Sequence, residues 1–243
     1  MASVVLHSDF TAEKISCTPI EKNKKGGRFV KLSYAGPKGP QRLTIQTPTI
    51  PLIFGVSPYQ DSASGEIQSY SIDISFRNDN TKDFLEKMRQ FDTKIVELAT
   101  ANSKEWFGKT MSQALVDEFY RRLVREPTNA QYAPVMKTKI SLVNGEPGCL
   151  FYDEECKPAT MDAFVRGAEI KLILECDRVW FINKSFGVSW RVLQARVISR
   201  PRRLDTYSFQ ADDNDGEETR NDAYDDDDGV VAAMLGNGSD GAM

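Results

Sequence analysis

The clearest strand pattern in the chain is Val188-Ser189-Trp190-Arg191-Val192-Leu193-Gln194-Ala195-Arg196-Val197-Ile198. Side chains point alternately to the two faces of a β-strand. An unbroken strand would place Leu193, Ala195 and Val197 on a core face. It would place Trp190, Gln194 and Arg196 together on the opposite face. The pattern therefore predicts a sheet with one apolar face and one face of rings and cations.

Strand patterns also occur on both sides of a segment with a different period. They cover residues 29–34, 42–46, 67–76, 136–143, 149–153 and 169–181. Between them, apolar residues recur at helical spacing from Phe84 to Leu98, and a second short helix is expected to begin at Ser112. This order predicts a mainly β fold, an antiparallel barrel or sandwich with a helical insertion at about residues 80–126.

Charge divides the chain into a basic body and an acidic end. The 243 residues carry a net charge of −4, and residues 205–243 hold twelve acidic residues and one basic residue, a net of −11. Residues 1–204 therefore sum to −4 + 11 = +7. We predict a flexible arm over 1–27, one domain over 28–204 and a disordered acidic tail over 205–243.

Several kinds of catalytic, nucleotide-binding and metal-binding site require residues or motifs that the sequence does not contain. His7 is the only histidine, which excludes sites with two histidines, and neither G-x-x-x-x-G-K-[ST] nor G-x-G-x-x-G occurs. Tail segments around Gly216 and Gly229 do not fit a calcium loop. No apolar run has the length of a membrane span, and no secretory signal is recognisable, so reduced thiols in an intracellular protein are expected. We predict no enzyme, no metal and no cofactor.

Basic residues interleaved with aromatic residues on successive strands favour nucleic-acid binding. Rings stack on bases and cations pair with phosphates, and neither contact needs a particular base sequence. Single-stranded DNA is the predicted partner, and Trp190→Ala is expected to weaken binding with little change in melting temperature. The candidate binding residues are Arg28, Lys31, Arg42, Lys137, Lys139, Lys171, Trp180, Lys184, Phe186, Trp190, Arg196 and Arg200.

The same residues allow other interpretations. The tryptophans could be core residues, with the cations solvating an outer face. The β-rich body and the apolar segment within the tail would also suit a structural or scaffold protein of a virus particle or replication factory. A duplex-binding architectural protein is a third alternative, although no recognition helix, zinc finger or basic zipper is apparent.

The chain resembles the single-stranded-DNA-binding proteins of nucleocytoplasmic large DNA viruses, which are similar to a single-strand binding protein of some phage replisomes. The resemblance rests on Phe91-Asp92, Asn102-Ser103-Lys104-Glu105-Trp106-Phe107-Gly108-Lys109, Phe151-Tyr152-Asp153, Trp180-Phe181 and Phe186-Gly187-Val188-Ser189-Trp190. It implies an OB-type barrel and a role in viral DNA replication, recombination and repair, at a replication site in the host nucleus or cytoplasm.

The resemblance also implies a function for the tail. In the phage relatives an acidic tail competes with DNA and recruits replication proteins. Here the expected partner-binding residues are Asp225, Asp226, Asp227, Asp228, Met234 and Leu235. The phage tails usually end in an aromatic residue, whereas this chain ends in Gly241-Ala242-Met243. A homodimer is left open.

Overall fold

The structure is a computed structural model that describes residues 3–24, 26–201 and 208–210. Of these, residues 3–24 and 26–201 belong to a first unit, and residues 208–210 belong to a second. The described helices all lie in the first unit. They are α1 (Lys82–Ala101), α2 (Ser103–Phe107) and α3 (Gln113–Phe119), with 3-10 turns at Ala12–Lys14, Asp79–Thr81 and Met161–Ala163.

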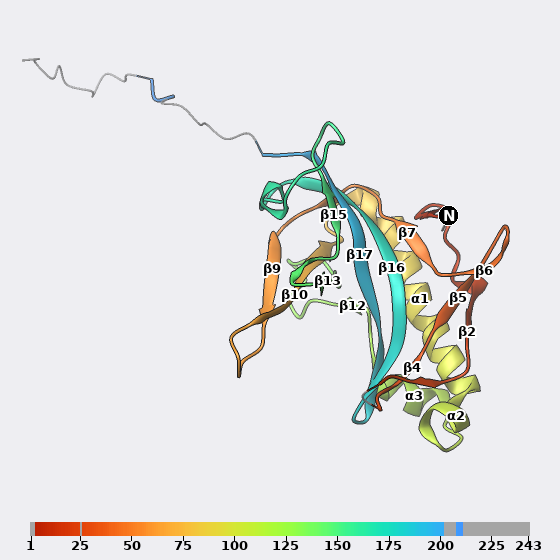
Figure 1. The fold of residues 1–243 in the computed structure, drawn as a ribbon. Coiled ribbons are helices and arrows are strands. Elements are labelled where there is room, and N and C mark those ends of the chain that lie inside the picture. The colour runs from red at the N-terminus through yellow and green to blue at the C-terminus, as the bar shows by residue number, and fades with distance from the viewer. Residues whose placement is uncertain (1–2, 25, 202–207, 211–243) are drawn as a thin grey trace, which may run out of the picture. The chain divides into compact units, whose positions relative to one another are not determined.

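The first unit is otherwise built from β-strands (Figure 1). One large sheet has the strand order β1-β7-β16-β17-β13-β10-β9, and β2-β5-β6 form a small second sheet. The strands are β1 (Val5–Leu6), β2 (Ile15–Cys17), β3 (Glu21–Lys22), β4 (Arg28–Val30), β5 (Leu32–Gly36), β6 (Gly39–Gln41), β7 (Thr44–Gln46), β8 (Ile50–Pro51), β9 (Val56–Gln60), β10 (Ile67–Ser75), β11 (Tyr120–Arg121), β12 (Val124–Arg125), β13 (Val135–Val143), β14 (Glu146–Pro147), β15 (Leu150–Tyr152), β16 (Glu169–Ile182) and β17 (Ser185–Ser199).

The long hairpin of β16 and β17 forms the centre of the large sheet (Figure 1). Ile182 pairs with Ser185, so only two residues make the turn. Asn183 adopts a φ of 54°, a left-handed conformation that asparagine tolerates better than most residues. Strands β4, β7 and β8 pair with β16, while β11, β13 and β15 pair with β17. Both hairpin strands are therefore flanked over much of their length.

Three register shifts interrupt the hairpin and decide which side chains face the core. Ile173 pairs with Gln194 but Leu174 pairs with Val192, so Leu193 is an extra residue on β17. A β-bulge of one residue exchanges the two faces of the strand beyond it. Trp190 is therefore on the same side as the buried Val192, Ala195 and Val197, and not with Gln194 and Arg196. The expectation that Trp190 shares a face with Arg196 is wrong for this reason.

The helical segment covers the inner face of the hairpin. Helix α1 buries Phe84, Met88, Phe91 and Ile95, as its spacing predicts. The ring of Phe91 lies 5.3 Å from the ring of Trp190. Ser112 caps α3, where its hydroxyl accepts a hydrogen bond from the backbone N–H of Leu115. The predicted class, mainly β with a helical insertion, is confirmed.

The sheet is mixed rather than purely antiparallel. Strand β1 pairs with β7 in parallel, and so do β11, β13 and β15 with β17. Strand β8 pairs with β16 and also lies against β10, so the curved sheet returns toward itself in an OB-fold-like barrel. Buried side chains from both strands of the hairpin and from α1 fill the interior.

The N-terminal segment differs from the expected flexible arm. Phe10, Ala12 and Ile15 are buried in the core, and Phe10 stacks on Tyr34 at 5.8 Å between ring centroids. Its strands contain only two or three residues each, too few to show a sequence period. The segment therefore packs as part of the first unit.

Residues 28–46 contribute strands to both sheets. Strand β4 joins the large sheet through β16, whereas β5 pairs with β2 and β6 in the small sheet.

Within the described residues no helix is both long and apolar enough to cross a membrane.

Candidate nucleic-acid interface

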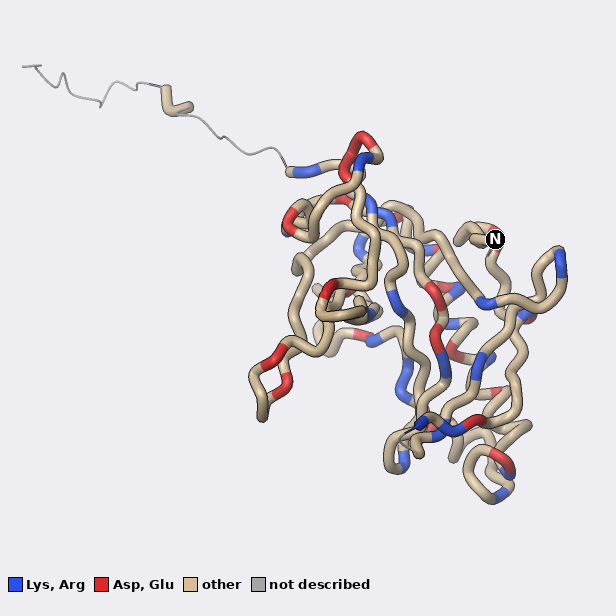
Figure 2. The backbone as a smooth tube through the Cα atoms, in the orientation of Figure 1, with Lys and Arg blue, Asp and Glu red and all other residues tan. Residues whose placement is uncertain are grey.

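The surface of the β16–β17 hairpin that points away from α1, here called the outer face, carries a row of cations. Lys171 and Arg178 lie on β16, and Arg191 and Arg196 lie on β17. Each is partly exposed, and Lys171, Arg191 and Arg196 each stand between two buried apolar residues. Figure 2 shows lysines and arginines along both strands. These positions are set by the alternation of strand side chains and by the register shifts of the hairpin.

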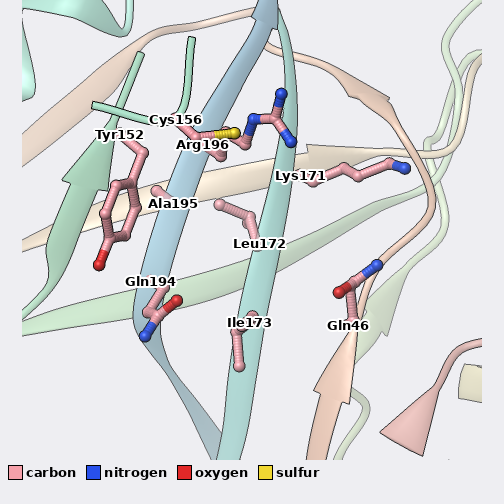
Figure 3. A pocket seen from close by; sticks show the side chains of 9 residues that line it. All are labelled: Gln46, Tyr152, Cys156, Lys171, Leu172, Ile173, Gln194, Ala195 and Arg196. Atoms are coloured by element: carbon pink, nitrogen blue, oxygen red, sulfur yellow. The ribbon is translucent and has the colours of Figure 1, made fainter. Parts of the chain in front are cut away.

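A hollow of about 320 Å³ lies at one end of the outer face (Figure 3). Lys171 and Arg196 pair across the two strands at this point. Tyr152 from β15 and the exposed Cys156 line the hollow from the side. Lys171 forms no ion pair with any described residue, so its ammonium is available to an anionic ligand. The hollow thus presents an aromatic ring and two cations to solvent.

The guanidinium of Arg196 is held in place by the loop that follows β15. Its Nη2 donates to the backbone carbonyl of Glu154 at 3.0 Å. Arg200, beyond the end of β17, pairs with the carboxylate of Glu154 at 3.0 Å. The loop therefore fixes one cation at the hollow and neutralises another beside it.

The centre of the outer face holds a carboxylate between two arginines. Glu175 on β16 accepts hydrogen bonds from Arg42 Nη1 at 3.1 Å and from Arg191 Nε at 3.2 Å. On the next strand, Lys139 is the register partner of Arg191. Lys139 is exposed, as is Lys137 two residues earlier on the same face of β13. The cationic surface therefore extends from β16 across β17 to β13.

A second hollow, of about 270 Å³, lies beyond this centre. Phe29 contributes a ring with the guanidinium of Arg178 5.0 Å and the ammonium of Lys31 5.7 Å from its centroid. Arg178 also pairs with Asp177 and Lys31 with Glu21. This part of the surface combines one aromatic ring with two cations whose charges are partly neutralised.

Trp180 lies on the outer face near the hairpin turn. It is partly exposed and pairs in register with Gly187. A Cβ atom on residue 187 would lie only 2.5 Å from Trp180 Cζ2, so the indole rests on a position that must be glycine. Arg28 is nearby, with its guanidinium 5.7 Å from the centroid of the Phe181 ring. Lys184 is exposed in the turn itself.

Two of the candidate rings are not available to a ligand. Trp190 is 1% exposed, and Phe186 is fully buried. Phe186 packs against Phe107 and Tyr120 at ring distances of 5.3 and 5.1 Å, because α2 and β11 cover this end of the hairpin. The structure contradicts the expectation that Trp190 and Phe186 stack on bases.

Six of the nine candidate cations fall into three groups. Lys171 and Arg196 meet at the first hollow; Arg42, Lys137 and Lys139 lie at or beside the central row; and Lys31 lines the second hollow. Arg28, Trp180 and Lys184 lie at the turn of the hairpin, and Arg200 follows β17. The tail candidates, Asp225, Asp226, Asp227, Asp228, Met234 and Leu235, lie outside the described residues.

Several residues of this surface are not predicted from the sequence. Arg178 and Arg191 are among them, because the sequence pattern does not indicate the bulges that orient their side chains. Tyr152 and Phe29 stand in strand patterns, but their neighbours across the hollows come from distant segments.

A third hollow, of about 620 Å³, includes the exposed Phe54 and Tyr132 together with Arg77 and Arg125.

Buried ionisable groups of the fold have structural roles. Asp92 on α1 accepts hydrogen bonds from Tyr120 Oη at 2.6 Å and from the backbone N–H groups of Leu123 and Val124. Burial raises the pKa of Asp92 above its usual value.

Among the described residues no group of three or more histidine, cysteine, aspartate or glutamate side chains is arranged to hold a metal ion.

Comparison with known proteins identifies the family. A family of unknown function (DUF5871) matches residues 66–211, more than half of the chain, so the chain belongs to this family. Among curated proteins, none matches the chain.

Among solved structures, two phage proteins are similar to the chain. The single-stranded DNA-binding protein from bacteriophage Enc34, solved in complex with single-stranded DNA, is 12% identical with a TM-score of 0.45, covering 78% of this chain and 98% of that one. The gp2.5 single-stranded DNA-binding protein of bacteriophage T7 is 9% identical with a TM-score of 0.43, covering 69% of this chain and 98% of that one.

Proposed function

We propose that this member of the DUF5871 family is a non-enzymatic protein that binds single-stranded DNA along the outer face of the β16–β17 hairpin. The observation that carries the proposal is that this face combines cations with accessible rings. Lys171 and Arg196 would bind phosphates at the first hollow, and Arg191 with Lys139 would do so at the centre. Such contacts bind the phosphate backbone without regard to base sequence.

Single-stranded DNA fits this surface better than a duplex. Tyr152 and Trp180 lie among the cations on the outer face, and both are partly exposed. The bases of a single strand can stack on such rings, whereas the bases of a duplex are already stacked on one another. Helices α1 and α3 bury side chains against the body of the protein, and α2 is only five residues long. These features favour the stacking of unpaired bases on exposed rings over the insertion of a helix into the groove of a duplex.

Tryptophan fluorescence tests the proposal. Of the three tryptophans, Trp106 and Trp190 are buried and Trp180 is partly exposed. Oligo-dT should therefore quench the fluorescence of the wild type through Trp180. Trp180→Phe should remove the quench and Trp190→Phe should retain it. If oligo-dT leaves the wild-type fluorescence unchanged and does not bind, the protein-scaffold hypothesis takes the place of this proposal.

The biological setting follows from the resemblance described above. We propose that the protein coats single strands during viral DNA replication, recombination and repair, at a replication site inside the infected cell. Membership of the single-stranded-DNA-binding family of nucleocytoplasmic large DNA viruses remains a prediction. Co-purification of the protein with replicating viral DNA from infected cells would support this setting, and its recovery only with capsid proteins would contradict it.

The acidic tail is proposed to compete with DNA and to recruit replication proteins. Its net charge of −11 opposes the +7 of residues 1–204. A tethered polyanion is present at high effective concentration and would lower the apparent affinity for DNA. Deletion of residues 206–243 should therefore tighten oligo-dT binding. Equal affinity of the truncated and full-length proteins across a salt series would rule out the competition.

A further inference from the structure

Glu175 lies in the middle of the outer face, where a carboxylate should repel DNA. It is the register partner of both Thr44 on β7 and Arg191 on β17, and Arg191 is in turn the partner of Lys139 on β13. Glu175 thus stands in a row that crosses four strands of the sheet. Such a position makes its charge part of any ligand contact at the centre of this face.

The three side chains form a layered cluster. The side chain of Glu175 is 10% exposed, whereas those of Arg42 and Arg191 are 62% and 36% exposed. One oxygen, Oε1, accepts from both guanidinium groups. A guanidinium has five N–H donors, and Glu175 takes one from Arg42 and two from Arg191. The arginines therefore lie above the carboxylate and keep donors for a ligand approaching from solvent.

We infer that Glu175 is an internal counterion of the binding face, an inference that rests on the proposed function. Two arginines and one carboxylate give the cluster a net charge of +1. The cluster consequently neutralises one phosphate, although it contains two arginines. The carboxylate therefore weakens the binding of single-stranded DNA at the centre of the outer face. It also makes the protein easier to displace from the DNA.

The alternative role for Glu175 is to position the arginines. A positioning carboxylate would favour binding, because it orders two flexible side chains before DNA arrives. The two roles predict opposite changes when the charge is removed. A counterion role predicts tighter binding, and a positioning role predicts weaker binding.

Salt dependence of oligo-dT binding separates the two roles. For single strands, the slope of log K against log salt concentration is about −0.7 for each phosphate neutralised. Glu175→Gln keeps the shape of the side chain and raises the cluster charge to +2, so the slope should steepen by about 0.7. Binding should become about eightfold tighter near 0.05 M salt if affinity at 1 M is unchanged.

A charge-compensating pair completes the experiment. Arg42→Gln lowers the cluster charge to zero and should make the slope shallower by about 0.7. The double variant Arg42→Gln/Glu175→Gln restores a charge of +1 and should return the slope to the wild-type value. If Glu175 positions the arginines instead, the double variant should bind no better than Arg42→Gln, and that result would overturn the inference.

The controls concern net charge and folding. Asp117→Asn on α3 removes one negative charge from another arginine pair, Asp117–Arg122 at 2.6 Å, and should leave the slope unchanged. Thermal melting checks each variant. If Glu175→Gln fails to fold because Arg42 and Arg191 then repel each other, the double variant carries the test, since it lacks that repulsion.

Failure of this inference differs from failure of the proposed function. If the wild type binds oligo-dT with a Trp180-dependent quench but the slopes do not follow the cluster charge, only the counterion role is wrong. If the wild type does not bind oligo-dT, the proposed function itself is wrong.

Discussion

The two faces of the β16–β17 hairpin each present a tryptophan, and the two indoles have opposite surroundings. Trp190 faces α1 and is buried, with its ring 5.3 Å from the ring of Phe91. Trp180 faces solvent and rests on Gly187, with Arg28 and Lys184 near the same turn. The difference shows that a register shift, rather than residue type, decides which ring supports the fold and which ring can meet a ligand.

Replacement of the inner ring should give the largest effect. Trp190→Ala removes a fully buried side chain and should lower the free energy of unfolding by about 3–5 kcal/mol. Urea denaturation measures this loss. The folded fraction should bind oligo-dT with wild-type affinity, because the outer face is intact. A stable variant with weakened binding would place Trp190 on the ligand side and remove the contrast between the faces.

Replacement of the outer ring should give the reverse pattern. Trp180→Ala should weaken oligo-dT binding by about 1–3 kcal/mol, the range for loss of one base-stacking contact. The free energy of unfolding should fall by only about 1 kcal/mol, as for a partly exposed residue. Fluorescence anisotropy of a labelled oligonucleotide measures the affinity. Unchanged affinity would show that the strand does not reach the hairpin turn.

A single cation on the outer face should give the smallest effect. Lys171→Gln should make the slope of log K against log salt shallower by about 0.7, because one phosphate contact is lost. Lys109→Gln, an exposed lysine that follows α2, is the matched control and should leave the slope unchanged. Equal slopes for the two variants would mean that charge attracts DNA to the whole body of the protein and not to this face.

Periodicity predicted much of the fold. The apolar spacing from Phe84 to Ile95 located α1, and the strand patterns around residues 136–143, 169–181 and 188–198 match β13, β16 and β17. These elements are long, so several turns or alternations support each of them. The short strands of residues 3–24 offered no such period, and their burial comes from tertiary packing.

The sequence predicts the residue types of the candidate site, but only part of their placement on the sheet. Lys171, Arg196 and Trp180 do lie on one face of the sheet. Trp190 and Phe186 do not, since a bulge at Leu193 exchanges the faces and α2 covers the end of the hairpin. The bulge and the packing of α2 both depend on contacts between distant segments. The alternation of side chains within one strand therefore does not predict them. Arg191 was missed for the same reason.

Protection of Cys156 from alkylation tests the central claim most directly. Cys156 is exposed and lines the hollow beside Lys171 and Arg196. Burial raises the pKa of the Cys149 thiol to about 12 and that of Cys176 well above its usual value, so these two should react slowly. Burial also raises the pKa of Cys17, and a Cys156→Ser variant measures the background from the other thiols.

The experiment compares the rate of iodoacetamide alkylation with and without saturating oligo-dT. If single-stranded DNA lies along the outer face, alkylation of Cys156 should slow severalfold, and the protection should disappear at high salt together with binding. An unchanged alkylation rate under conditions where oligo-dT is fully bound would contradict the assignment of this face to DNA.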